Sequence, residues 1–198
     1  MMDANTLARC TGSTPGAAAI YAGHLAVQME RFEIDTRARK AAFLANVSVE
    51  TLRLAAVEED LNYRTADRLR LIFPSLFVAA KGGKHRAEDY VRRPDALSEL
   101  RYRGYHGRGL LHLTWLENYA AAGAELGFDY VGKPSLVSLP EHAAATACWF
   151  WAEFKKLNPA ADRGDMYEIR GKVNGPARLQ LAETMSLRTT ALRVLGEG

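Results

Sequence analysis

Apolar side chains recur at intervals of three and four residues along most of the chain, which is the spacing of one face of an α-helix. The pattern predicts a short helical turn at residues 7–10, followed by a longer helix that opens at Pro15. Ser13 or Thr14 can cap this helix, because a side-chain hydroxyl oxygen accepts a hydrogen bond from a free N–H at a helix start. Its apolar side is expected to consist of Ile20, Leu25, Val27, Met29 and Phe32.

A second long helix is expected to begin at Asp35 or Thr36 and to carry one carboxylate, Glu50, inside an apolar run. An acid in apolar surroundings costs free energy unless something pairs with it or uses it. Glu59 follows nine residues later, and at about 100° per residue nine positions place two side chains on opposite faces of one continuous helix. The two carboxylates can share a groove only if the helix ends soon after Glu50, so we expect it to stop within residues 52–56.

A short helix is predicted after a cap at Thr65. It should bury Leu69, Leu71 and Ile72 and end at Pro74, because proline cannot continue a helix.

The second half of the chain is helical around one polar interval. Residues 79–109 are rich in glycine and basic side chains and are predicted to form a loop with at most a short helix at residues 87–92. Helices are expected over residues 116–126, from Pro140 onward, and on both sides of residues 174–176. The fold class is therefore mainly α, with at most a small β element.

The length and composition fit one soluble globular domain over residues 1–198, with about the first 14 residues as an N-terminal extension. Hydrophobic residues make up 48% of the chain and charged residues 25%. The net charge of +3 suits an anionic polymer as partner, but the basic residues are spread along the chain, so we expect no nucleic-acid binding.

The sequence also bears on location. It has no apolar run of 18 residues, so no stable membrane insertion is expected. The N-terminus lacks the basic start and apolar block of a secretory signal, so synthesis in the cytoplasm without a signal peptide is expected.

Cys10 and Cys148 are the only two cysteines, and neither belongs to a C-x-x-C pair or has a histidine nearby. No metal site and no cofactor are therefore expected. Two free thiols are favoured over one long-range disulfide, because a chain of this size does not need a covalent staple.

The candidate chemistry rests on the acids. Two carboxylates facing a groove, here Glu50 and Glu59, are the minimum equipment for hydrolysing a glycosidic bond. Gly107-Arg108-Gly109 lacks the ending of a phosphate-binding loop. Its glycines let the backbone run close either to a ligand or to another segment, and the spacing leaves both explanations open.

Four segments, in order, resemble glycoside hydrolase family 19, and within it the branch of phage and prophage endolysins related to plant-type chitinases. The match extends from about residue 15 to residue 190, and the resemblance implies a lysozyme-like helical bundle with two lobes around a substrate cleft. The segments are "IDTRARKAAFLANVSVE", "EEDLNY" (family "EENLNY"), "RYRGYHGRGLLHLTWLENY" (family "YRGRGLIQLTGRENY") and "CWFWAEFKKLNPAADRGDMYEIRGKVNG".

Residue roles follow from the resemblance by position. Glu50 falls on the family's general acid and Glu59 on the carboxylate that activates water, which implies single displacement with inversion. Thr114 falls on a threonine that places the water or the sugar, and His112 stands where the family has glutamine. Positions expected to bind substrate or to tie the walls of the cleft together are Asn62, Tyr63, Arg108 and Asn174. Asp162 and Arg163 are expected to form an ion pair.

The chain departs from the family's pattern close to the acids. Val49 replaces a histidine, and Thr51-Leu52-Arg53-Leu54 replaces Ser-Gly-Gly-Phe, so both glycines are missing where the chain must bend. Trp115 replaces the glycine after the "QLT" motif, and the loop before Gly107 is shortened.

The interpretation drawn from these features is a cell-wall lytic glycosidase that cuts the β-1,4 bonds of peptidoglycan glycan strands, as a phage-type endolysin does. It would be a monomer that acts in the periplasm or cell wall, after holin-dependent release or after delivery as a toxin with an immunity protein. The shortened loop favours a wide cleft and hence peptidoglycan. A chitinase acting on N-acetylglucosamine polymers and a non-catalytic sugar-binding relic of the fold are the alternatives.

Overall fold

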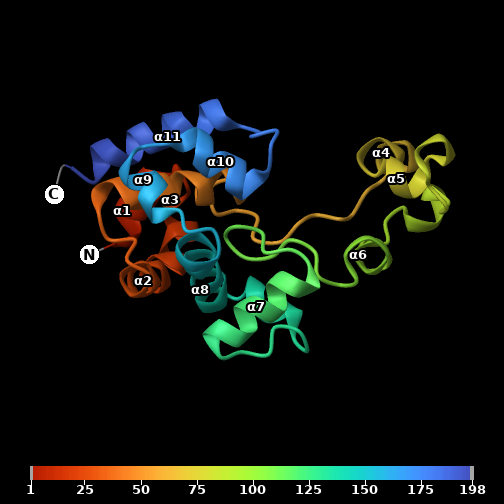
Figure 1. Ribbon diagram of the computed structural model, residues 1–198, viewed down its shortest axis with the longest axis horizontal. Coiled ribbons are helices and arrows are strands. Elements are labelled where there is room, and N and C mark those ends of the chain that lie inside the picture. Colours follow the sequence, from red (N-terminus) through yellow and green to blue (C-terminus); the bar gives the residue numbers. More distant parts are fainter. Residues whose placement is uncertain (1, 197–198) are drawn as a thin grey trace.

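The structure is a computed structural model that describes residues 2–196. These residues form a lysozyme-like, mainly helical fold, and their only β pairing consists of the isolated bridges Glu58–Arg108 and Arg108–Leu113 (Figure 1). The predicted fold class is confirmed. Among residues 2–196, no helix combines the length and apolar character that crossing a membrane requires.

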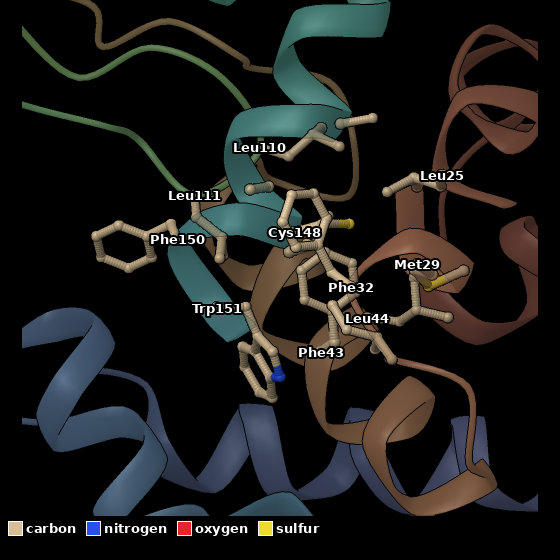
Figure 2. Packing of buried hydrophobic residues seen from close by; sticks show 14 of the residues in the cluster. Leu25, Met29, Phe32, Phe43, Leu44, Leu110, Leu111, Cys148, Phe150 and Trp151 are labelled. Atoms are coloured by element: carbon tan, nitrogen blue, oxygen red, sulfur yellow. The ribbon is translucent and has the colours of Figure 1, made fainter. Parts of the chain in front are cut away.

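A larger lobe is built from both ends of the chain around one continuous core (Figures 1 and 2). Its elements are α1 (Ala4–Thr11), α2 (Pro15–Arg31), α3 (Arg37–Glu50), α7 (Leu116–Leu126), the 3-10 turn η3 (Pro134–Ser138), α8 (Pro140–Trp149), the π-helical turn η4 (Phe150–Phe154), α9 (Asn158–Asp162), α10 (Met166–Asn174) and α11 (Leu181–Val194).

Helix α3 is the centre of this lobe. Every residue from Ala41 to Val49 is buried, because α1, α9, α10 and α11 all pack against it. Phe43 meets Trp151 edge to face, with ring centroids 5.4 Å apart (Figure 2). The acid at the end of α3 is therefore held by a deeply packed helix.

A smaller lobe has a core of its own, made of Leu61, Leu69, Phe73, Phe77, Ala87 and Leu97. It comprises α4 (Ala66–Ile72), α5 (Pro74–Phe77), the 3-10 turns η1 (Ala79–Lys81) and η2 (Ala87–Tyr90), and α6 (Pro94–Tyr102). Two stretches of chain, residues 51–65 and 103–115, connect it to the larger lobe (Figure 1).

The first residues belong to the core. Leu7, Cys10 and Thr11 on α1 are buried, and the Ser48 hydroxyl donates to the Thr11 carbonyl oxygen at 2.6 Å. Helix α1 packs against α2, α3 and α11, so the described part of the expected N-terminal extension over about residues 1–14 lies within the larger lobe.

Several helix starts agree with the sequence. Thr14, Thr36 and Thr65 each accept a capping hydrogen bond, and α7 has the predicted bounds. Both cysteines are free, as expected, and both are buried.

The expected burial is wrong at four apolar positions. Ile20 and Val27 on α2, and Leu71 and Ile72 on α4, are between 40% and 67% exposed. Within residues 2–196, these four side chains lie at the surface. The polar interval also contains more helix than expected, namely α6.

Candidate active site

Glu50 is the last residue of α3, and its side chain is 14% exposed. Its Oε1 accepts a hydrogen bond of 2.8 Å from Nη1 of Arg170, a fully buried residue of α10. The same guanidinium donates to Asn46 Oδ1 and to the Leu179 carbonyl oxygen. A buried cation requires such acceptors, so the network fixes the carboxylate against the larger lobe.

The chain turns sharply after Glu50 without a glycine. Leu52, Arg53 and Leu54 have φ values of 48°, 63° and 65°, which lie in the left-handed region that favours glycine. The Arg53 N–H donates to the Ser48 carbonyl oxygen at 2.7 Å, the bond that closes a Schellman-type helix end. The predicted break is confirmed, but α3 ends at Glu50 itself, before residues 52–56.

Glu59 lies on the first connection between the lobes, and a separate set of groups holds it. Tyr102, at the end of α6, donates its hydroxyl to Oε1 at 2.9 Å. The Gly107 N–H donates to Oε2 at 3.3 Å, and the Glu59 N–H donates to the Gly107 carbonyl oxygen at 2.8 Å. The carboxylate is thus anchored where the smaller lobe meets the second connection.

His112 and Thr114 lie directly beside Gly107. A β-carbon on Gly107 would lie 3.1 Å from His112 Cβ and 3.4 Å from Thr114 Oγ1. Thr114 donates its hydroxyl to the His112 carbonyl oxygen at 2.8 Å, whereas Nε2 of His112 is buried without a hydrogen-bond partner. Both predicted residues therefore adjoin the segment that holds Glu59.

For Gly109 the structure decides between the two explanations left open by the sequence. With φ of 80°, this glycine approaches Val137 and Thr146, which a β-carbon would meet at 3.2 Å. Close packing against these two residues therefore explains why glycine occupies position 109.

The neighbouring carboxylate, Glu58, organises a network that the sequence did not reveal. It accepts hydrogen bonds from His106 Nε2 and Arg108 Nε, both at 2.8 Å, and from Ser138 Oγ at 3.1 Å. Nδ1 of His106 lies 3.3 Å from Arg108 Nη2, which can only donate, so the imidazole carries its proton on Nε2.

Burial lowers the pKa of His106 and outweighs the opposing effect of its bond to Glu58. Burial alone would raise the pKa of Glu58, but the hydrogen bonds from His106 and Arg108 prevail and lower it. The pair therefore exists as a carboxylate and a neutral imidazole at neutral pH.

The other residues expected to bind substrate or tie the walls together have mostly structural partners. Arg108 is 8% exposed and also donates to the Gly104 carbonyl oxygen and the Tyr119 hydroxyl. Tyr63 packs edge to face on a phenylalanine of the smaller core. Asn174 accepts the Leu179 N–H at 2.9 Å. These three side chains therefore contact other parts of the fold, and of the four residues only Asn62 is exposed.

The expected pairing of Asp162 with Arg163 is wrong. Asp162 accepts from Arg39 at 2.7 Å, whereas Arg163 pairs with Glu168 at 2.7 Å. Asp162 thereby links α9 to α3.

The arrangement offers two carboxylates with separate supports, one in the larger lobe and one at the junction of the lobes. No group of three or more His, Cys, Asp or Glu side chains within residues 2–196 is arranged to hold a metal ion.

Comparison with known proteins decides the family. The sequence profile of glycoside hydrolase family 19, described as chitinase class I, matches residues 17–165. The chain belongs to glycoside hydrolase family 19. Both carboxylates lie inside the matched region.

Curated relatives include plant chitinases. Endochitinase EP3 of Arabidopsis thaliana is 28% identical over 155 residues, which cover 78% of this chain and 48% of that protein. Endochitinase At2g43580 of the same plant is 46% identical over 69 residues, which cover 34% of this chain and 25% of that protein. The chain thus spans about a quarter to a half of the length of these relatives.

Solved structures share the fold. Chitinase C from Streptomyces griseus matches with a TM-score of 0.63 and 22% identity, covering 98% of this chain and 76% of that one. A bacterial family 19 chitinase matches with a TM-score of 0.65 and 22% identity, covering 98% and 95%.

Proposed function

We propose that this protein hydrolyses β-1,4 bonds between N-acetylated amino sugars by an inverting two-carboxylate mechanism. The observation that carries the proposal is the separate anchoring of the acids, Glu50 by Arg170 and Glu59 by Tyr102 and the Gly107 N–H. Separate supports allow two carboxylates to act on opposite faces of one sugar ring.

In the proposed step, protonated Glu50 gives its proton to the glycosidic oxygen as the bond from that oxygen to C1 breaks. A water molecule attacks C1 from the opposite face and gives a proton to Glu59, so the configuration at C1 inverts. Tyr102 orients Glu59, and the role we propose for Thr114 is to position the water or the sugar.

Peptidoglycan is the substrate we propose first. Residues 60–105, which include the smaller lobe, hold ten of the Lys and Arg residues and six of the Asp and Glu residues. Their net charge is therefore +4, against +3 for the whole chain. A positive lobe beside Glu59 attracts an anionic glycan. Chitin is the second candidate, which the names of the relatives favour.

In the cell we propose the role of a phage-type endolysin. The protein would act as a monomer on the cell wall, after release through a holin or after delivery as a toxin with an immunity protein. Expression with and without a holin tests this role, which requires lysis to depend on the holin.

The test compares wild-type protein with Glu50→Gln and Glu59→Gln on peptidoglycan and on soluble chitin, counting new reducing ends. We expect wild type to release ends from peptidoglycan faster than from chitin, and each variant to lose at least about a hundredfold in rate. Faster release from chitin would establish the second candidate. No release from either polymer would identify a non-catalytic sugar-binding relic.

A further inference from the structure

Trp115 is an exposed aromatic side chain in an unfavourable backbone conformation. It precedes α7 with φ of 79° and ψ of 141°, and it is 39% exposed. Such a φ is sterically unfavourable for any residue other than glycine, and the exposed part of the ring contributes no buried surface to the fold. The other two tryptophans, Trp149 and Trp151, are buried.

Aromatic contacts connect Trp115 with the anchored carboxylate. Its ring lies 5.2 Å from the ring of Tyr102, centroid to centroid, at an interplanar angle of 56°. The Tyr102 hydroxyl is the group that donates to Glu59. Thr114, the neighbouring residue, lies beside Gly107, whose N–H donates to the other oxygen of Glu59. Trp115 therefore borders the site on the side of the proposed base.

A positive charge lies on the same aromatic surface. The Arg101 guanidinium carbon is 4.8 Å from the centroid of the Trp115 ring and 5.4 Å from that of Tyr102. Arg101 is exposed, and no carboxylate of residues 2–196 lies within ion-pair distance of it. Stacking orients the guanidinium and leaves its N–H donors available to a ligand.

We propose that Trp115 and Arg101 form a subsite for an amino sugar that carries a carboxylate, the kind of sugar found in peptidoglycan. The apolar C–H face of the sugar ring packs on Trp115, and the carboxylate pairs with Arg101, to which it can bind in bidentate fashion. The inference rests on the proposed function, because it assigns the substrate preference of that same site.

Tryptophan fluorescence of the Glu50→Gln variant measures binding without turnover. Trp115 is the exposed one of the three tryptophans, so a ligand at the subsite changes the emission. The ligands are an N-acetylglucosamine oligomer, which is neutral, and a muramyl-containing peptidoglycan fragment of the same number of sugars. We expect the anionic fragment to bind about tenfold tighter, which corresponds to about 1.4 kcal/mol.

Substitutions in the Glu50→Gln background separate the two contributions. Arg101→Gln should abolish the preference for the anionic fragment, whereas Arg103→Gln, which removes a neighbouring exposed charge, should keep that preference. Trp115→Gly should lower the affinity for both ligands, which calorimetry can measure because it does not depend on tryptophan emission. Trp115→Phe should restore part of that affinity. A preference that survives Arg101→Gln, or affinities that survive Trp115→Gly, would overturn the subsite.

Reducing-end release by variants that retain Glu50 distinguishes this failure from failure of the proposed function. If wild type cleaves peptidoglycan and Arg101→Gln and Trp115→Gly cleave it equally well, the subsite is wrong and the function stands. If wild type cleaves neither polymer, the function is wrong, and the binding measurements still decide the subsite.

Discussion

At the residue scale, the turn after α3 shows how this chain places Glu50 without the glycines typical of its family. Leu52, at the position after the helix cap, adopts a conformation for which glycine is usual. Its side chain is 67% exposed, so packing does not compensate for the backbone strain. The strain is the local cost of ending α3 at the acid.

Leu52→Gly is therefore expected to leave stability unchanged or to raise it by up to about 1 kcal/mol. Relief of about 1–2 kcal/mol of left-handed strain outweighs a glycine entropy cost of about 0.5–1 kcal/mol. Urea unfolding measures the difference. Leu54→Gly is the matched control, because Leu54 has the same conformation but is buried, and it should destabilise. A loss of more than 1 kcal/mol in Leu52→Gly would contradict this explanation.

The sequence predicted Glu50 and Glu59 as the two catalytic candidates and, from helix geometry, a break between them, and the structure confirms the break. It did not identify Arg170, which lies 120 residues from Glu50, because nothing local marks a guanidinium that will be buried. It also did not show that three left-handed residues would replace glycine. Tertiary packing imposes both features.

At the element scale, α6 connects the smaller lobe to Glu59 through the Tyr102 hydroxyl. The polar interval hid this helix, since only Leu97 and Ser98 of α6 are buried, too few for a recognisable apolar period. Cap residues, by contrast, predicted the starts of α2, α3 and α4, because capping depends on neighbouring residues alone.

Tyr102→Phe should lower kcat about tenfold and should also lower the free energy of unfolding. The substitution removes a hydrogen bond to a charged group worth about 1.5–3 kcal/mol and leaves the ring contact with Trp115. Reducing-end kinetics and thermal unfolding check the two expectations. Unchanged kcat would show that the hydroxyl does not position Glu59.

The burial of His106 beside Glu58, between the two connections, should make stability depend on pH. The folded-state pKa of His106 is below its ordinary 6.5. The stability that neutral His106 contributes to the folded state is therefore complete above pH 6.5, and it is lost as the pH falls toward the folded-state pKa. The stability that ionised Glu58 contributes is present above its ordinary pKa of 4.5 and is lost as the pH falls below that value.

Urea unfolding between pH 7.5 and 5 measures the effect. Wild type should lose stability as the pH falls, and His106→Gln should show a flatter dependence. His24→Gln, which alters an exposed histidine, should keep the wild-type slope. Equal slopes in wild type and His106→Gln would assign the pH dependence to other groups.

At the scale of the whole molecule, two hydrophobic cores support the two carboxylates. The larger core holds α3 and Glu50, and the smaller core holds α6, whose Tyr102 orients Glu59. The sequence resemblance implied two lobes. The separation of their cores became visible only in the structure, because apolar periodicity does not show which faces meet.

Leu69→Ala should open the smaller lobe selectively. Leu69 is fully buried in the smaller core, and its truncation should cost about 2–5 kcal/mol. Hydrogen exchange should show α4 and α6 losing protection while α3 keeps its own. Leu44→Ala, in the larger core, should reduce the protection of α3. Uniform loss of protection in Leu69→Ala would mean that the two cores unfold as one.

Glu50 and Glu59 are proposed to act together in a single displacement, and the anomeric configuration of the first product tests this mechanism. Proton NMR during wild-type cleavage of a soluble β-1,4-linked oligomer should show the α-anomer first, before mutarotation. Glu59→Gln should produce neither anomer at a measurable rate. Initial appearance of the β-anomer would contradict this mechanism. The β-anomer means retention of configuration, which requires a double displacement instead of a single one.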